Sequence, residues 1–221
     1  MDLVDLHMQD IYKELAADIS QRSAAAASRP FIVAIAGPPG VGKSTTSRKL
    51  QSMLLDSAIV PMDGFHYYRS QLEQFANKDQ AFARRGAHWT FDAAKFVDKL
   101  RVLRENNSYD AIKFPSFDHA IGDPIEDDIE VSARCKVIII EGNYLCLSDE
   151  PWCQVLDNHL VDYSIYITAS MEVLRERIIQ RHQSVGMSLE EAISRADNND
   201  LINAALIETC KARADRIVVS L

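Results

Sequence analysis

The sequence lacks any apolar run near the ~20 residues that a membrane-spanning helix needs. Its first residues, MDLVDLHMQD, carry acidic side chains where a secretory or transit peptide would carry basic ones. Cysteine is scarce: there are four, with no CxxC pair and no regular spacing, which predicts free thiols in a reducing compartment and neither a zinc site nor a disulfide framework. We therefore expect a cytoplasmic protein without a membrane partner.

Positive charge is also in short supply, because 24 Lys and Arg face 32 Asp and Glu, for a net charge of -8. Affinity for nucleic acids comes largely from Lys and Arg side chains that displace counterions, so we expect no nucleic-acid partner. The 221 residues, 47% hydrophobic and 25% charged, have the composition of one globular domain with a sizeable core. The sequence leaves the oligomeric state open, a homodimer included.

Apolar strands alternate with amphipathic helices along the chain. Runs such as FIVAIA, VIIIE and YSIYIT are apolar at almost every position, which is typical of a parallel sheet covered on both faces. The pattern predicts an α/β fold. The expected strands are 31–36, 58–62, 137–141, 163–168 and 216–220, the expected helices are 2–22, 43–55, 91–104, 170–182 and a segment from 188, and short extra strands are expected within 111–119 and 127–133.

The segment GPPGVGKST follows the first predicted strand, opens a predicted helix, and fits the phosphate-binding pattern G-x-x-x-x-G-K-[ST]. Its glycines let successive N–H groups point at phosphate oxygens, and the helix N-terminus adds partial positive charge. Lys43 is expected to reach the β- and γ-phosphates, and Ser44 to offer its hydroxyl to Mg²⁺. The predicted ATP-binding residues are Gly37, Pro38, Pro39, Gly40, Val41, Gly42, Lys43, Ser44 and Thr45.

Three classes of P-loop protein compete at this point: remodelling ATPases, GTP switches and small-molecule kinases. Pro-Pro-Gly in the loop is common in remodelling ATPases, but these normally end the Walker-B strand with Asp-Glu, whereas Glu141 here follows Ile140. A GTP switch needs N-K-x-D for guanine, and NKDQ (77–80) has its acid one place early and lies too early in the fold. A small-molecule kinase is therefore the favoured class.

Two acidic residues end predicted strands where ligands of open α/β sheets gather. Asp63 follows the second strand, 20 residues after Lys43, where it can address the acceptor hydroxyl; capping of the next turn is its alternative role. Glu141 ends the VIIIE strand and is expected to hold Mg²⁺. Phe65 and His66 are expected to wall the acceptor.

Five segments resemble, in order and approximate spacing, the group of phosphoribulokinases, uridine kinases and bacterial-type pantothenate kinases, over roughly residues 31–203. They are VAIAGPPGVGKSTTSRKLQ, VPMDGFHYY, RRGAHWTFDAAKF, FPSFDH and VIIIEGNYLCL. The resemblance implies that Asp63, within a D-G-F triplet, is the acceptor base. RRGAHWTFD is similar to the R-[KR]-G-x-P-x-[ST]-[YF]-D stretch of pantothenate kinases, with His88 and Trp89 as departures. Arg85 would then face an anionic substrate, or else be a solvated surface arginine.

The same resemblance implies further site residues. FDH places His119 in a segment that helps to bind the acceptor across the group. Arg177 and Arg181, four apart on a predicted helix, correspond to a lid that lays arginines over the transferring phosphate. ADNNDLINA is similar to the N-D-x-x-N-A stretch of a subgroup that includes bacterial kinases associated with fructose transport and a fungal ATP-dependent kinase.

Together these features predict one P-loop NTPase-fold kinase domain over residues 1–221, with a helix and connector at 1–28 and a small helical lid at 170–204. We expect it to use ATP and Mg²⁺ to phosphorylate a hydroxyl of a small metabolite. A sugar or sugar-like acceptor is preferred over pantothenate, whose motif is altered at 87–89, and over uridine. The opposing class is an ATP-binding regulatory protein without turnover, against which the intact Lys43, Ser44, Asp63 and Glu141 argue.

Overall fold

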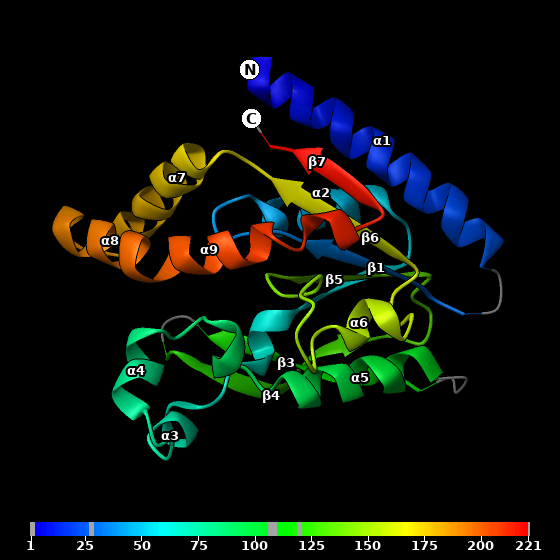
Figure 1. The fold of residues 1–221 in the computed structure, drawn as a ribbon. Coiled ribbons are helices and arrows are strands. Elements are labelled where there is room, and N and C mark those ends of the chain that lie inside the picture. Colours follow the sequence, from blue (N-terminus) through cyan, green and yellow to red (C-terminus); the bar gives the residue numbers. More distant parts are fainter. Residues whose placement is uncertain (1–2, 27–28, 106–109, 119–120, 221) are drawn as a thin grey trace.

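The centre of the computed structural model, which describes residues 3–26, 29–105, 110–118 and 121–220, is a five-stranded parallel sheet. The strand order is β2-β5-β1-β6-β7 (Figure 1). The strands are β1 (Phe31–Ala36), β2 (Ser57–Pro61), β5 (Val137–Gly142), β6 (Tyr163–Thr168) and β7 (Arg216–Val219). The predicted α/β class with a parallel, helix-flanked sheet is confirmed.

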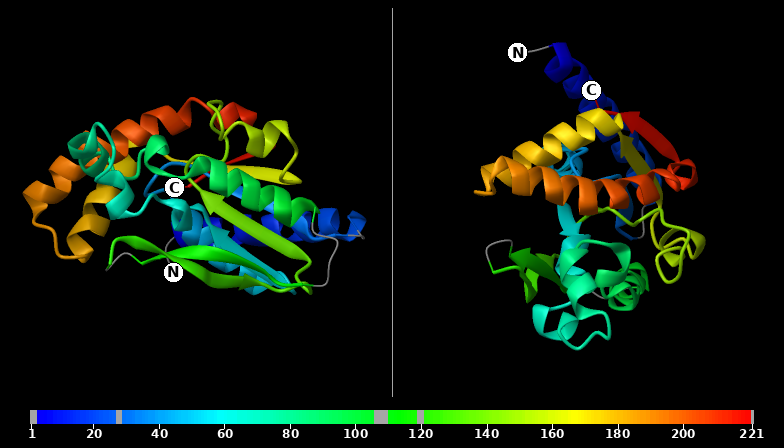
Figure 2. Two further views of the ribbon diagram at one scale, coloured as in Figure 1. Left: turned by 90° about the horizontal axis from the view of Figure 1, so that it is seen from below. Right: turned by 60° about the vertical axis from the view of Figure 1, so that its left-hand side comes forward.

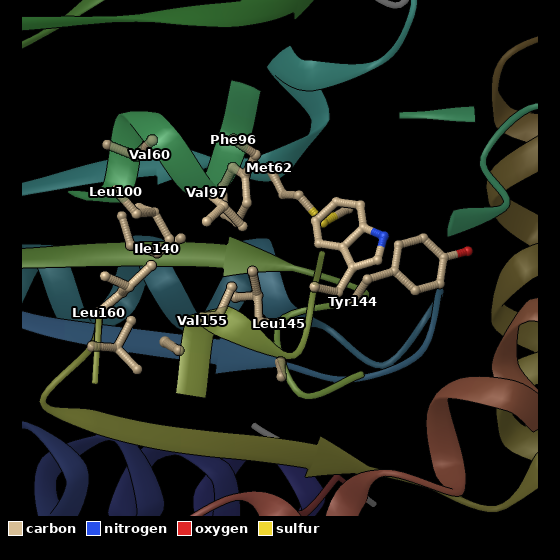
Figure 3. Close-up of a cluster of buried hydrophobic side chains, with 14 of the residues drawn as sticks. Val60, Met62, Phe96, Val97, Leu100, Ile140, Tyr144, Leu145, Val155 and Leu160 are labelled. Carbon is tan, nitrogen blue, oxygen red and sulfur yellow. The ribbon is translucent and has the colours of Figure 1, made fainter. Parts of the chain in front are cut away.

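Both faces of the sheet are covered, because alternate side chains of β1 enter two different cores. Phe31, Val33 and Ile35 belong to a buried cluster with side chains from α1 (Leu3–Ala25) and α2 (Lys43–Met53). The residues between them belong to a cluster with α5 (Ala93–Glu105) and α6 (Gln154–Asp157), part of which Figure 3 shows. This two-sided burial is why the strand reads as apolar throughout.

A smaller antiparallel pair lies beside the main sheet, formed by β3 (Ile112–Asp118) and β4 (Asp123–Val131) (Figure 1). The expected extra strands are therefore present. Short helical pieces connect β2 with α5. They are η1 (Met62–Phe65), α3 (Arg69–Leu72), α4 (Lys78–Ala83) and η2 (His88–Thr90).

The D-G-F triplet lies in the 3-10 turn η1 and not in the strand, because β2 ends at Pro61. This turn packs directly on β3: a Cβ atom on Gly64 would lie 2.0 Å from the carbonyl oxygen of Pro115. Phe65 points into the core, where its ring meets Phe96 edge-on at a centroid distance of 5.1 Å. The expectation that Phe65 walls the acceptor is wrong, because the close packing of η1 on β3 fixes its ring inside.

The C-terminal helices lie on the side toward which β1 and β6 point (Figure 1). They are α7 (Met171–Ser184), α8 (Leu189–Arg195), the π-helical turn η3 (Ala196–Asp200), α9 (Leu201–Glu208) and η4 (Lys211–Arg213). Ser170 caps α7, and a Ser188/Glu191 capping box opens α8. Figure 2 shows the pair α7 and α8–α9 standing out from the sheet. They occupy the segment for which we predict a lid, and that role stays a prediction.

Among the described helices, none has an apolar stretch long enough to cross a membrane.

Candidate active site

A cavity of about 300 Å³ opens where β2 and β5 end, at the carboxyl edge of the sheet. It draws residues from the P-loop, both strand ends, the loop before α5, and the helices α7 to α9. Its lining is Pro39, Lys43, Ser44, Pro61, Asp63, His66, Arg85, Gly86, Phe91, Phe117, Glu141, Gly142, Asn143, Arg181, His182, Arg195, Asp200 and Asn203. Half of the sixteen predicted site residues therefore line one cavity: Pro39, Lys43, Ser44, Asp63, His66, Arg85, Glu141 and Arg181.

The P-loop has the geometry of a phosphate cradle. Gly37 has φ +146°, and a Cβ atom there would lie 2.3 Å from the carbonyl oxygen of Ile167, so only glycine fits. Helix α2 begins at Lys43, and no side chain of the described residues caps its N-terminus. Its first N–H groups and its positive dipole end are therefore available to an anion. The local backbone fits the phosphates of ATP.

Lys43 lies at the floor of the cradle, where its Nζ donates to the carbonyl oxygen of Pro38 at 2.9 Å. Burial lowers the pKa of Lys43 to about 8, against the opposing pull of Glu141 and Asp63, and Arg181 lowers it further. Removal of the ammonium group from water thus lowers the pKa of Lys43 by more than the attraction of the two carboxylates raises it. The negative charge of a bound phosphate would raise the pKa of Lys43 again and so favour its charged form. This is the behaviour expected of a lysine that binds phosphate.

Ser44 and Glu141 form an oxygen pair beside the lysine, with the Ser44 hydroxyl donating to Glu141 Oε2 at 2.9 Å. Burial raises the pKa of Glu141, while Lys43 and the Ser44 hydrogen bond lower it. Hydroxyl and carboxylate oxygens are ligands that Mg²⁺ accepts, usually with phosphate oxygens completing the set. The described residues contain no cluster of three or more His, Cys, Asp or Glu that would hold a metal alone. The pair therefore fits Mg²⁺ carried in with ATP.

Asp63 is held in place by its own backbone. Its carbonyl oxygen accepts hydrogen bonds from the His66 amide at 3.1 Å and from His66 Nδ1 at 2.8 Å. Because a carbonyl has no proton, Nδ1 carries the hydrogen. The imidazole is packed between Phe91 and Phe117, with ring centroids 3.9 Å and 4.5 Å away. These two phenyl rings supply the aromatic wall expected from Phe65, and the turn presents the Asp63 carboxylate to the cavity.

Arg85 also lines the cavity. Its Nη2 donates to the carbonyl oxygen of Tyr67 at 2.9 Å and to Asp123 Oδ1 at 3.1 Å. The guanidinium lies 5.5 Å from the centre of the Phe117 ring. Burial lowers the pKa of Arg85, and the contact with Asp123 opposes this shift. Arg85 is therefore not a solvated surface arginine.

The loop 84–86 is fastened to the C-terminal helices by a set of contacts that we call the loop clasp, made by Tyr144, Arg195, Asn199 and Asn203. Arg84 donates from Nε to Asn199 Oδ1 at 3.0 Å and from Nη2 to Asn203 Oδ1 at 2.8 Å. The π-helical turn η3 carries Asn199, and Asn203 follows four residues later on α9. The sequence resemblance pointed to this segment without showing its role.

The other clasp contacts hold the backbone of the loop. Arg195 Nη2 and Asn199 Nδ2 both donate to the carbonyl oxygen of Arg85, at 2.8 Å and 3.1 Å. The hydroxyl of Tyr144 donates to the carbonyl oxygen of Gly86 at 2.6 Å. Figure 3 shows this hydroxyl directed out of the core, toward the helices. The loop that bears Arg85 is thus fixed from two sides.

The arginines predicted for the lid separate in the structure. Arg181 lines the cavity and is exposed, and the described residues give its guanidinium no hydrogen bond or ion pair. Arg177 lies outside the cavity lining and donates to Ser220 Oγ at 2.9 Å.

His119 lies outside the described residues. The lining also contains His182, paired with Asp200 at 2.9 Å, which sequence reasoning missed because each residue is unremarkable in its own segment.

The chain is similar to several known proteins. A Schizosaccharomyces pombe protein named "Putative uridine kinase C227.14" is 39% identical over 198 residues, which cover 86% of this chain and 83% of that one. The ATP-dependent kinase YFH7 of Eremothecium gossypii is 31% identical over 76% of this chain, which spans only 61% of that relative. The solved structure of a "putative fructose transport system kinase" from Silicibacter sp. TM1040 superposes with a TM-score of 0.84 at 33% identity, covering 94% of this chain and 98% of that one.

The match to a family agrees with the geometry of the cavity. Residues 32–221 match the phosphoribulokinase / uridine kinase family, a span that includes the P-loop, Asp63, Glu141 and the loop clasp. The chain belongs to the phosphoribulokinase / uridine kinase family of P-loop kinases, which transfer phosphate.

Proposed function

We propose that this protein is an ATP- and Mg²⁺-dependent kinase that moves the γ-phosphate of ATP to a hydroxyl group of a small, sugar-like metabolite. The observation that carries the proposal is the position of Asp63, whose side chain lines the same cavity as Lys43 and the Ser44–Glu141 pair. Asp63 is near enough to Lys43 to act on its charge. A base and a phosphate cradle thus face one small space.

Each residue has a distinct part in this proposal. Asp63 accepts the proton of the acceptor hydroxyl as its oxygen bonds to the γ-phosphorus, and the bond from that phosphorus to the β,γ-bridging oxygen breaks to release ADP. Lys43 and Arg181 offset the negative charge on the transferring phosphate. Ser44 and Glu141 would hold Mg²⁺, which when bound neutralises phosphate charge. The cavity walls position the hydroxyl.

The choice of a sugar-like acceptor rests on two supports. A relative at 33% identity is named for fructose transport, and the pantothenate-like motif is altered at 87–89. The relative named as a uridine kinase makes uridine the first competitor. The remaining alternative is a protein that binds ATP without turnover.

A screen of hydroxylated metabolites tests the proposal, with ADP release and the mass of the product as readouts. Wild type should phosphorylate at least one, and Asp63→Asn should cut that rate at least ~100-fold while ATP affinity stays nearly unchanged. Asp79→Asn, an exposed carboxylate on α4, is the matched control and should behave as wild type. Full turnover by Asp63→Asn would remove Asp63 from the mechanism, and a panel without any product would favour the ATP-binding protein without turnover.

A further inference from the structure

The last turn of α7 carries two adjacent residues that line the cavity and differ in their surroundings. Arg181 is exposed, and no described residue holds its guanidinium by a hydrogen bond or an ion pair. Burial lowers the pKa of Lys43 most, and the nearby charge of Arg181 lowers it further. His182 is buried. The place of Arg181 over the cavity therefore depends on where this turn of the helix lies.

His182 attaches this turn to the π-helical turn η3. Its Nε2 lies 2.9 Å from Asp200 Oδ2, and because a carboxylate has no proton, Nε2 donates the hydrogen. Each of the two side chains is only 11% exposed. A hydrogen bond to a charged group is stronger than a neutral one, and little water competes for this one. The pair is thus a firm attachment of α7 where the helix lines the cavity.

A second contact joins the same two elements and serves as a comparison. Arg175 donates from Nε and Nη2 to the two carboxylate oxygens of Asp197, at 2.7 Å and 3.0 Å. These side chains are 42% and 41% exposed, and neither lines the cavity. Exposed ion pairs contribute little, because water and salt screen them. Of the two contacts, the one between His182 and Asp200 is both buried and next to Arg181.

The turn η3 also holds the loop 84–86. Asn199 accepts a hydrogen bond from Arg84 and donates one to the carbonyl oxygen of Arg85. Asp200 is the next residue, and both Asn199 and Asp200 are buried. A π-helical turn holds one residue more than an α-helical turn, and such turns are frequent at functional sites. One widened turn therefore binds both the helix that carries Arg181 and the loop that carries Arg85.

We propose that His182 and Asp200 are positioning residues, which hold the last turn of α7 against η3 and so direct Arg181 at the transferring phosphate. This inference rests on the proposed kinase function and adds to it two residues that act through Arg181. Arg181 supplies the charge, and the pair fixes its place relative to the acceptor loop. Without the pair, the enzyme would bind both substrates but transfer phosphate slowly, because the charge that stabilises the transition state would be misplaced.

Two variants at position 182 test the pair by steady-state kinetics. His182→Leu removes the donor and keeps an apolar side chain, so kcat should fall about tenfold to a hundredfold while KM for the acceptor stays unchanged. His182→Gln offers an amide N–H in place of Nε2 and should recover most of kcat. Arg175→Gln breaks the exposed contact between the same elements and should keep the wild-type kcat. Equal losses in the Leu and Gln variants, or a loss in Arg175→Gln as large as in His182→Leu, would overturn the proposal.

A double-mutant cycle shows whether the pair acts through Arg181. In an Arg181→Gln background, His182→Leu should lower kcat little further, because the group that it positions is already gone. Asp200→Asn keeps the shape of the side chain but makes the hydrogen bond neutral, so its loss of kcat should be intermediate. It takes the place of His182→Leu in the cycle if that variant folds poorly. Full additivity would mean that the pair acts on the substrates directly and would overturn the proposal.

Nucleotide binding separates this inference from the proposed function. Calorimetry gives the affinities for ADP and for a non-hydrolysable ATP analogue, both with Mg²⁺. The ratio of the two affinities should move toward ADP about threefold to tenfold in His182→Leu, and should stay at the wild-type value in Arg175→Gln. If no acceptor is phosphorylated, this shift would support the placement of Arg181 although the kinase function fails, and an unchanged ratio would overturn it. If the wild type turns over and His182→Leu matches it, the inference fails and the proposed function stands.

Discussion

The two sides of the cavity are built in different ways. The phosphate side comes largely from one segment, residues 37–45 after β1, to which the neighbouring strand β5 adds Glu141, paired in register with Ile35. The acceptor side combines the η1 turn, the loop 84–86 and the π-helical turn η3, far apart in sequence. Phosphates are recognised largely by backbone N–H groups and a helix end, which a short segment can supply. An individual metabolite needs side chains from several directions.

The two sides of the cavity also differ in the interactions that stabilise them. The cradle depends on backbone conformations such as that of Gly37 and on the pairing of parallel strands. The acceptor loop depends on side-chain hydrogen bonds from the loop clasp, each worth about 0.5 to 1.5 kcal/mol. Changes on the phosphate side should therefore abolish chemistry, whereas changes in the clasp should mainly weaken acceptor binding.

The largest effect is expected for Lys43→Met on the phosphate side. Loss of the ammonium group that faces the phosphates should lower kcat/KM for both substrates about a thousandfold. Steady-state kinetics with a saturating acceptor and then with saturating ATP would measure this. Lys49→Met, on the exposed side of the same helix α2, should stay at wild-type rates. A Lys43→Met enzyme within tenfold of wild type would show that the cradle works through its backbone alone.

A smaller and one-sided effect is expected for Asn203→Ala in the loop clasp. Arg84 would lose the acceptor of its 2.8 Å hydrogen bond, and the loop that bears Arg85 would be held less firmly. We expect KM for the acceptor to rise about tenfold and the free energy of unfolding to fall by about 1 to 2 kcal/mol. The affinity for ATP, measured by calorimetry, should not change.

Asn198→Ala is the matched control, because the Asn198 side chain is exposed and its hydrogen bonds to described residues stay within its own helical segment, at Ser194. It should leave both KM values unchanged. If Asn203→Ala weakened the binding of ATP and of the acceptor equally, the two sides of the cavity would not act independently, and the comparison would fail.

A weaker effect is expected for Tyr144→Phe. The ring keeps its packing against Phe91 and Trp152, and only the hydrogen bond to the carbonyl oxygen of Gly86 is lost. We expect a loss of about 1 kcal/mol of stability and a rise of a few-fold in acceptor KM. Combined with Asn203→Ala, the effects on KM should be non-additive, since both residues hold one loop. Strict additivity would indicate that the two contacts act independently.

The sequence predicted the phosphate side well because its signals are local. The spacing of the P-loop motif and the apolar run before Glu141 place these residues without knowledge of distant contacts, and the structure brings them to one cavity. The same holds for the parallel sheet, whose strands are apolar throughout. Asp63 also reached the cavity, although it lies in a 3-10 turn beyond the strand.

The acceptor side could be predicted only in part, because its geometry depends on which segments meet. Whether Phe65 or Phe117 faces the cavity is decided by the contact of Gly64 with Pro115, which no local pattern reveals. Arg177 and Arg181 share a helix, yet only Arg181 lines the cavity, because Arg177 meets Ser220 just after β7. The role of the clasp asparagines is visible only in the structure, where both accept hydrogen bonds from Arg84.

The last expected effect concerns stability alone and is a gain of stability in ligand-free Lys43→Met. Because burial lowers the pKa of Lys43 to about 8 from an ordinary 10.5, folding penalises its charged form. One pKa unit corresponds to about 1.4 kcal/mol, and partial relaxation around the half-buried side chain should leave a gain of about 1 to 2 kcal/mol at about pH 7. The pKa of about 8 already includes the attraction of Glu141 and Asp63, which opposes the lowering by burial.

The pH dependence gives the sign of this effect. Between the folded pKa of about 8 and the ordinary value of 10.5, the unfolded chain binds more protons at Lys43 than the folded one, so this group makes the wild type more stable as pH rises through that window. Lys43→Met should lack this rise, and Lys49→Met should keep it. Urea unfolding in EDTA without nucleotide, at pH values below, within and above the window, measures both. If the Met variant were less stable than wild type below the window, the charged form of Lys43 would not destabilise the ligand-free protein. Bound phosphate would then not be needed to offset a buried positive charge.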